Sequence, residues 1–197
     1  MIYWSLTIGA YLIGSLSSAI LVSMLLHLPD PRKHGSLNPG ATNVLRLGSK
    51  VGAGLTLLGD ILKGTLPILV VEQWISSDPL LLSGIAIGAF SGHLFPIYFK
   101  FTGGKGVATA LGIYLALNPF IALIQIGTWI VTAFVLRYSS LAAIITTILT
   151  PVYVWFWLNS NIFMGLTTLI ALLLIFRHKK NIQRLLNGTE PKINFWS

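Results

Sequence analysis

A lysine stands inside a glycine-rich stretch, FTGGKGVATALG, that apolar sequence flanks on both sides. Glycines allow successive backbone N–H groups to turn toward an anion, and the lysine adds a positive charge beside them. A helix that begins just after such a stretch also attracts anions to its first turn. The residues Gly103, Gly104, Lys105 and Gly106 are therefore candidates for binding a phosphate group.

This stretch is not a Walker A loop. That motif has a glycine six residues before its lysine and a serine or threonine directly after it. The chain has Phe99 and Gly106 at those two positions. One alternative stays open, in which Lys100 and Lys105 only anchor an ordinary loop on the cytoplasmic side of a membrane.

A second polar segment, HGSLNPGATNVLRLGSK, offers more groups of the same kind. Its glycines and asparagines tolerate unusual backbone angles, which exposes N–H groups that can surround an anion. Arg46 supplies a planar guanidinium suited to phosphate. The hydrogen-bonding side chains of the segment are those of Ser36, Asn38, Thr42 and Asn43. The alternative is an ordinary loop with a helix N-cap at Thr42 or Asn43.

The third polar segment is FRHKKNIQRLLNGTEPK, near the end of the chain. On a helix that continues past the membrane, Arg177, Asn181 and Arg184 would share one face, with His178 three residues before Asn181. Gly188 is predicted to end this helix. A basic amphipathic tail on anionic lipid is the alternative. We favour it for the cations but not for His178 and Asn181, because neither is needed for lipid attraction.

The composition places these segments in a membrane protein. The chain has 197 residues, of which 54% are hydrophobic and only 9% are charged, whereas a soluble domain carries about 25% charged residues. The net charge of +8 would suggest nucleic acid for a soluble protein, but cytoplasmic loops of membrane proteins collect basic residues. The absence of cysteine excludes disulfides, thiolate metal sites and a cysteine nucleophile.

Apolar runs predict an all-α, polytopic integral membrane protein with seven transmembrane helices. The runs lie at about 3–26, 53–72, 79–98, 106–117, 120–136, 141–158 and 161–176. We expect one domain over residues 1–197, with cytoplasmic motif loops at about 27–52, 99–106 and 177–197. Five spans, with the short segments re-entrant, is the alternative.

The charges fix the predicted orientation, with the N-terminus outside and the C-terminus cytoplasmic. Twelve of the thirteen basic residues then fall inside, Lys63 lies within a span, and Glu72 and Asp78 fall outside. Cytoplasmic enrichment of lysine and arginine is typical of membrane proteins. The only carboxylates expected inside are Asp30 and Glu190, which argues against a carboxylate-bound metal.

Some residues within the spans also carry expectations. Asp60 and Lys63 are costly in lipid unless they pair, so we interpret them as a neutralising structural pair. His93 near the inner edge is either a catalytic base or a capping group, and we favour the second. Three glycines at four-residue spacing predict close approach of another helix: Gly84, Gly88 and Gly92.

With these residues in view, the chain resembles the bacterial acyl-phosphate:glycerol-3-phosphate acyltransferases of the PlsY type. Their first motif is approximately GSGNxGATNxxR, and residues 35–46 here are GSLNPGATNVLR. The second is similar to GHxxPxxxxFKGGKGVAT, here GHLFPIYFKFTGGKGVAT at 92–109. The third resembles HxxNIxRLxxGxE, here HKKNIQRLLNGTE at 178–190. The three motifs occur in order, and the similarity runs nearly end to end.

Two positions depart from these motifs. Leu37 stands where the family has glycine, so we expect a stiffer first loop that follows a different path. Thr102 stands where the family has lysine, which removes one cation from the glycine loop.

The resemblance implies transfer of a fatty acyl group from acyl phosphate to the 1-position of sn-glycerol 3-phosphate, giving lysophosphatidic acid and inorganic phosphate. It implies no nucleotide, metal or other cofactor. The implied catalytic residues are Ser36, Arg46, Lys105, His178 and Asn181. The implied substrate-binding residues are Gly35, Asn38, Gly40, Thr42, Asn43, Gly103, Gly104 and Gly106. Either His178 or a phosphate oxygen of the substrate would act as the general base.

The expected location is the bacterial cytoplasmic (inner) membrane, with several spans and an active site that faces the cytoplasm. The expected partners are the two substrates and membrane lipids but no nucleic acid, and a monomer is favoured over oligomers, which stay open. An organic-phosphate membrane transporter is the main alternative function, and a lipid-anchoring scaffold is a third.

Overall fold

The computed structural model describes residues 2–194, and the regular elements in that range are all helices. The chain divides into two compact units, Met1–Leu117 and Asn118–Ser197, which are described in turn. Residues 1 and 195–197 of the predicted single domain, and so the end of the predicted third loop, lie outside the described residues.

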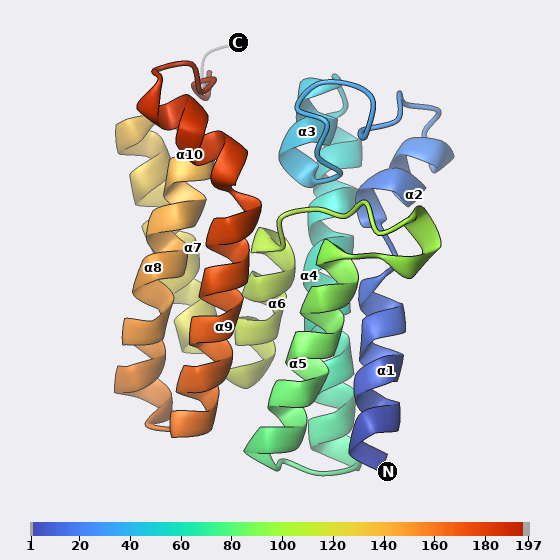
Figure 1. The fold of residues 1–197 in the computed structure, drawn as a ribbon, viewed down its shortest axis with the longest axis vertical. Coiled ribbons are helices and arrows are strands. Elements are labelled where there is room, and N and C mark those ends of the chain that lie inside the picture. Colours follow the sequence, from blue (N-terminus) through green and yellow to red (C-terminus); the bar gives the residue numbers. More distant parts are fainter. Residues whose placement is uncertain (1, 195–197) are drawn as a thin grey trace. The chain divides into compact units, whose positions relative to one another are not determined.

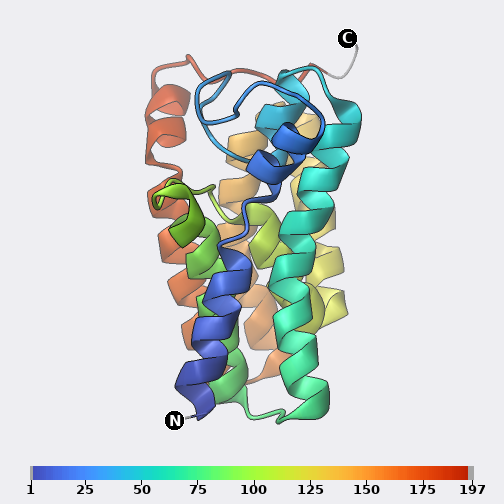
Figure 2. The same ribbon diagram turned by 90° about the vertical axis from the view of Figure 1, so that its right-hand side faces the viewer.

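The first unit is built from six α-helices and one short 3₁₀ helix (Figure 1). They are α1 (Ile2–Gly14), α2 (Ser18–Leu25), α3 (Ala41–Arg46), α4 (Lys50–Trp74), α5 (Pro79–Leu94), η1 (Ile97–Phe99) and α6 (Val107–Leu117). Figures 1 and 2 show the N-terminus at one end of this unit and the loops before α3 and before α6 toward the other. The first two polar segments therefore lie toward the same end.

Small residues let the helices of this unit approach closely. A side chain at Gly88 or Gly92 of α5 would collide with backbone oxygens of α1, those of Thr7 and Tyr11. The predicted glycine stripe is therefore confirmed, and α1 is the helix that packs on it. Between α4 and α6, Thr65 donates to the carbonyl oxygen of Gly112 at 2.8 Å.

The first apolar run is not one continuous helix. Helix α1 ends at Gly14 and α2 begins at Ser18. The break leaves carbonyl groups without a helical partner, and the ammonium of Lys63 donates to the carbonyl oxygen of Leu16 at 2.9 Å. The two helices together still cover 24 residues, enough for one span.

The second unit contains α7 (Pro119–Leu136), α8 (Ser139–Leu158), α9 (Asn161–Arg177) and α10 (Lys179–Leu186). Helix α8 packs on both α7 and α9. Gln125 of α7 donates to the hydroxyl of Thr150 of α8 at 2.7 Å. Inside an apolar pair of helices such a hydrogen bond satisfies groups that lipid could not.

The predicted straight helix through the third polar segment is wrong. Helices α9 and α10 meet at His178 with a bend of 58°, so Arg177 does not continue the face of Asn181 and Arg184. The predicted end at Gly188 is confirmed. Its φ is +68°, and the N–H of Thr189 donates to the carbonyl of Arg184 at 2.8 Å, the pattern of a Schellman motif.

Counting α1 and α2 as one, the described chain has five helical segments long and apolar enough to cross a membrane, and the bent pair α9–α10 makes a sixth if it counts as one span. Helix α6 has only 11 residues. An all-helical membrane protein is thus confirmed, whereas the seven-span count and the orientation of the termini stay predictions.

Candidate active site

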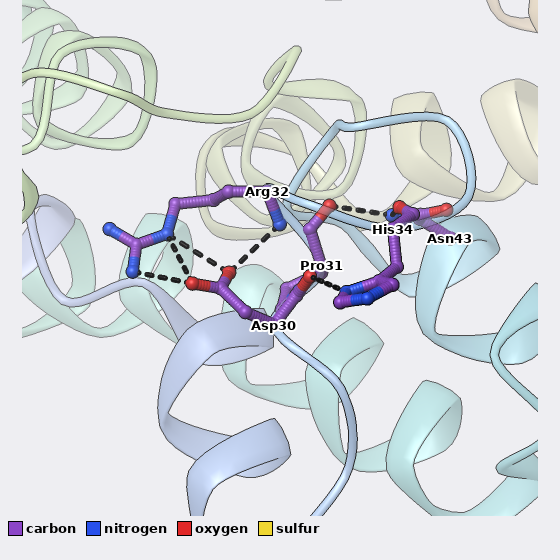
Figure 3. Close-up of polar contacts among 5 residues, drawn as sticks. All are labelled: Asp30, Pro31, Arg32, His34 and Asn43. Atoms are coloured by element: carbon purple, nitrogen blue, oxygen red, sulfur yellow. Dashed lines mark hydrogen bonds and ion pairs between the residues drawn. The ribbon is translucent and has the colours of Figure 1, made fainter.

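The side chain of Asn43 organises residues 30–40, the loop before helix α3, which is called the first loop below (Figure 3). Its amide nitrogen donates to the carbonyl oxygens of Pro31 at 2.8 Å and His34 at 3.0 Å. Its amide oxygen accepts the backbone N–H of Ser36 at 2.8 Å. With only 1% of its surface exposed, Asn43 uses both ends of its amide to hold the backbone of this loop.

Two residues of this loop have left-handed backbone angles. Gly35 has a φ of +64°, and a side chain there would collide with the amide oxygen of Asn43. Leu37 has a φ of +60°, a conformation that glycine adopts readily but that costs another residue about 1–2 kcal/mol. The leucine at the family's glycine position therefore puts strain into the loop.

Helix α3 begins earlier than expected. Its N-cap is Gly40, and the helix starts at Ala41, so the alternative cap at Thr42 or Asn43 is wrong. The physical reason is that the Asn43 amide is already bound to the loop. Thr42 is exposed, and Asn38 is half-buried.

The two arginines of this region, Arg32 in the loop and Arg46 in α3, differ in what they contact, and Figure 3 shows the contacts of Arg32. Arg32 binds Asp30 through its guanidinium, with a shortest distance of 2.7 Å between Nη2 and Oδ2. This hydrogen bond lowers the pKa of the Asp30 carboxyl, so the charge of Arg32 is neutralised at neutral pH. Arg46 is exposed in the last turn of α3 and makes no ion pair among residues 2–194. Of the two guanidinium groups, only that of Arg32 is neutralised by a carboxylate within residues 2–194.

The glycine loop packs against the end of α5 and against the first loop. The N–H of Gly104 donates to the carbonyl oxygen of His93 at 3.2 Å. A side chain at Gly104 would collide with the His93 ring and stand 3.0 Å from the carbonyl oxygen of Pro39. Gly103 is as closely packed, against backbone oxygens of His93 and Leu94. The close packing therefore requires glycine at positions 103 and 104. The half-buried Lys105 follows them directly in the chain.

Residues on either side of Gly103 and Gly104 have left-handed backbone angles. Gly106 has a φ of +89°, and a side chain there would collide with the ring of Phe90. Before the glycines, Lys100 and Phe101 both have positive φ. The exposed Thr102 donates its hydroxyl to the carbonyl oxygen of Lys100 at 3.4 Å, so the residue that replaces the family's lysine contacts the turn itself.

The predicted ion pair inside the first unit is confirmed and has a third member. Lys63 Nζ lies 2.9 Å from Asp60 Oδ1, and His93 Nδ1 lies 3.5 Å from the same oxygen. All three residues are buried. The His93 ring stands between this carboxylate and Gly104.

In the second unit His178 is held at the bend between α9 and α10. Only 2% of the residue is exposed, and Nδ1 lies 2.9 Å from the carbonyl oxygen of Leu174. Because a carbonyl only accepts, Nδ1 carries the proton in this contact. In the neutral ring the lone pair is then on Nε2, the tautomer that a general base needs.

Glu190 is a residue that sequence reasoning did not select. Its carboxylate accepts hydrogen bonds from Ser140 at 2.6 Å, from Asn181 at 2.7 Å and from Arg184 at 2.7 Å. Burial raises the pKa of Glu190, but these hydrogen bonds outweigh it and the net pKa is lowered. The glutamate thus fixes the side chain of Asn181. Its position as the last residue of the third motif is the sequence feature that could have identified it.

Among the described residues, no group of three or more histidine, aspartate and glutamate side chains is arranged to hold a metal. The first unit contains the predicted Ser36, Arg46 and Lys105, and the second contains His178 and Asn181.

The model of the family "Glycerol-3-phosphate acyltransferase" matches residues 4–188. The glycerol-3-phosphate acyltransferases of Methylococcus capsulatus and Thioalkalivibrio sulfidiphilus are 52% and 50% identical to this chain. Each match covers 96% of this chain, and 96% and 93% of those proteins. The chain belongs to the glycerol-3-phosphate acyltransferase family.

Solved structures of this family agree with the fold. This chain is similar to PlsY, an integral membrane glycerol 3-phosphate acyltransferase, in its glycerol 3-phosphate form, with a TM-score of 0.93 and 36% identity. The form with lysophosphatidic acid gives a TM-score of 0.89. In each case 98% of this chain and 96% of that chain are covered. The family resemblance carried by the three motifs is thereby confirmed.

Proposed function

We propose that this chain transfers a fatty acyl group from acyl phosphate to the 1-position hydroxyl of sn-glycerol 3-phosphate. The hydroxyl oxygen forms a bond to the acyl carbonyl carbon, and the bond from that carbon to the phosphate oxygen breaks. The hydroxyl proton passes to a base. The products are lysophosphatidic acid and inorganic phosphate, so the atoms balance without a redox partner.

One observation carries the proposal beyond family membership. Two motifs that are remote in the sequence meet in the first unit, where Gly104 packs against the carbonyl of Pro39 and the N–H of Gly104 is held by His93. This contact brings the glycine loop, which carries Lys105, against the first loop, which contains Ser36, and Arg46 lies in helix α3 directly after that loop. Backbone N–H groups, a lysine and an arginine are the groups that bind phosphate.

An acyl phosphate is a mixed anhydride and needs little activation. The enzyme must hold the hydroxyl near the carbonyl carbon and stabilise charge on the carbonyl oxygen and on the departing phosphate. We assign Lys105 and Ser36 to the head group of the acyl phosphate. Each hydrogen bond to a charged group contributes about 1.5–3 kcal/mol, so a few such bonds supply a useful part of the stabilisation.

We assign Arg46, His178 and Asn181 to the phosphate or the attacking hydroxyl of glycerol 3-phosphate. With Nδ1–H donating to the carbonyl oxygen of Leu174, Nε2 of His178 is the atom that would take the proton. A phosphate oxygen of the substrate can take the proton instead, because the second pKa of a phosphate monoester is about 6. The candidate glycines and Asn38, Thr42 and Asn43 shape the substrate-binding backbone.

The proposal includes seven spans, with the N-terminus outside and the reaction at the cytoplasmic face of the inner membrane. In this arrangement α6, at 11 residues, also counts as a span, the fourth along the chain and a short one. The positive charge of the first two loops then lies on the side where lysine and arginine are enriched in membrane proteins. A lipid-tailed substrate would keep its tail in the membrane.

The test is an assay of the purified protein with palmitoyl phosphate and labelled glycerol 3-phosphate, without nucleotide or metal. We expect 1-acyl lysophosphatidic acid and an equal amount of inorganic phosphate. Parallel reactions contain palmitoyl-CoA or palmitoyl acyl carrier protein, and we expect no product from either. Product from those donors alone would overturn the proposed donor.

Proteoliposomes distinguish the alternative function. If labelled glycerol 3-phosphate entered the vesicles and no lysophosphatidic acid formed with any donor, the protein would be a transporter. His178→Gln tests the base separately. Near-normal turnover would remove His178 from that role, and loss of turnover with unchanged glycerol 3-phosphate binding would support it.

A further inference from the structure

A series of buried polar side chains crosses the first unit and ends beside the glycine loop. It begins at the break between α1 and α2, where the carbonyl of Leu16 accepts from Lys63 at 2.9 Å. Lys63 pairs with Asp60 at 2.9 Å, and Asp60 faces His93 at 3.5 Å. The His93 ring in turn fills the space where residue 104 would carry a side chain.

This series is more than a neutral ion pair needs. The charges of Asp60 and Lys63 already cancel, and such a pair inside a span is sufficient to reduce the cost of burial. Adding a third polar side chain costs free energy unless its contacts are useful. The contacts of His93 run outward from the pair to the glycine loop, through its ring and through its backbone carbonyl, which accepts from Gly104 at 3.2 Å.

We propose that Asp60 and His93 are positioning residues that fix the glycine loop at Gly104 and thereby set the position of Lys105. The Asp60 carboxylate faces Nδ1 of the imidazole at 3.5 Å, and Nε2 on the opposite edge of the ring fills the space beside Gly104. In this role neither residue needs to touch substrate. The inference rests on the proposed function, because it assigns a purpose to the place of Lys105.

The expected effect on the reaction is large because Lys105 is covalently adjacent to the contact. Gly104 has no side chain to fill a gap, so removing the His93 ring leaves the loop free to move by about the size of the lost group. A displacement of about 1 Å in a reacting group can cost about 10²-fold in rate. The loss should appear in kcat with acyl phosphate more than in the KM for glycerol 3-phosphate.

The first experiment compares His93→Asn with His93→Gln and with Thr65→Val. The amide of asparagine stands near the position of Nδ1 and can reproduce the contact with Asp60, but it does not reach Gly104. The longer glutamine side chain places its amide near the position of Nε2, on the Gly104 side. Thr65→Val is the matched control, because Thr65 is an equally buried polar residue of α4 whose hydrogen bond goes to Gly112 and not to the loop. All variants are measured as full-length protein in detergent.

Two readouts are taken for each variant: steady-state kinetics with palmitoyl phosphate, and amide hydrogen exchange of the peptide that spans the glycine loop. We expect His93→Asn to lose about 10-fold or more in kcat and to exchange faster at the loop. We expect partial recovery of both in His93→Gln. Thr65→Val should lower the melting temperature without faster loop exchange or a comparable loss in kcat.

A double-mutant cycle gives an independent test. Gly104→Ala puts a methyl group against the His93 ring, and His93→Ala removes that ring. If the two residues act through one contact, the double variant will lose no more activity than the worse single variant. Asp60→Asn combined with Lys63→Met removes both charges together, so that no unpaired charge prevents folding, and it should also accelerate loop exchange.

The proposal is overturned if loop exchange in His93→Asn matches wild type, or if the two losses in the cycle simply add. It is equally overturned if kcat falls only in proportion to the folded fraction, as in the Thr65→Val control. Hydrogen exchange needs no substrate. If wild type makes no lysophosphatidic acid the proposed function fails, while the exchange data still decide whether His93 fixes the loop.

Discussion

The side-chain oxygen of Asn43 accepts the backbone N–H of Ser36 at 2.8 Å, across seven positions of the chain. The same side chain also donates to two carbonyl groups of the loop. The side chain of Asn43, which the family resemblance assigned to substrate binding, is therefore bound on both sides to its own backbone. It shapes the loop from which Ser36 would act, and that loop leads into the helix that carries Arg46.

Asn43→Asp should abolish this organisation although it hardly changes the volume. The new carboxylate would face the carbonyl oxygens of Pro31 and His34, which can only accept. We expect a lower melting temperature and a loss of about 10²-fold in kcat/KM, since the loop would move by about an ångström. The exposed Asn161→Asp, at the first turn of α9 where a negative charge is tolerated, is the control. Equal activity of the two variants would contradict the assignment.

Gly35→Ala should be more harmful than Gly48→Ala. Both glycines have positive φ, +64° and +95°, so both alanines carry backbone strain. Only at Gly35 does the added methyl group also collide with the amide oxygen of Asn43, because the space around Gly48 is open. Melting temperature and turnover of the two variants measure the difference. If both lost the same amount, strain alone would matter and the Asn43 contact would not.

Leu37→Gly should leave the stability nearly unchanged. Glycine relieves about 1–2 kcal/mol of left-handed strain but increases the conformational entropy of the unfolded chain, which costs about 0.5–1 kcal/mol. Leu37→Ile places a β-branched residue at φ +60° and should clearly lower the melting temperature. Thermal unfolding in detergent compares the two. A neutral isoleucine would show that the backbone is not strained there, and a large stabilisation by glycine would show that the strain far outweighs the entropy cost.

Glu190→Gln should remove a stabilisation that depends on pH. The folded-state pKa of Glu190 lies below its ordinary value of 4.5. The stabilisation is therefore fully present above about pH 4.5, and it is lost as the pH falls through the lowered folded pKa. We expect the variant to melt below wild type at pH 7, and the two melting curves to converge in acid. A difference that stayed constant with pH would mean that the charge of Glu190 is not what stabilises the fold.

Asn181 should lose its fixed orientation in the same variant. The carboxylate accepts from both Asn181 and Arg184, and a glutamine can keep only part of this arrangement because its amide nitrogen cannot accept. Kinetics at neutral pH should therefore show a higher KM for glycerol 3-phosphate. Ser140→Ala, which removes one donor and leaves the charge, should have a smaller effect of the same kind.

The sequence by itself determined the helical membrane class, the polar segments and the family. The length of an apolar run by itself indicates whether the run can cross a membrane. The motifs are contiguous in the sequence, so neither inference needs knowledge of distant contacts. Local spacing also sufficed for the Asp60–Lys63 pair, which is three residues apart on one helix, and for the helix end at Gly188.

Only the tertiary structure decided which polar residues hold the loops. The hydrogen bond from Ser140 to Glu190 joins residues 50 positions apart, and the contact of His93 with Gly104 depends on how α5 packs against the glycine loop. The bend at His178 likewise interrupts a helix whose sequence has no proline there. Composition and local spacing do not specify such contacts, because they arise when separate helices pack and bring their loops together.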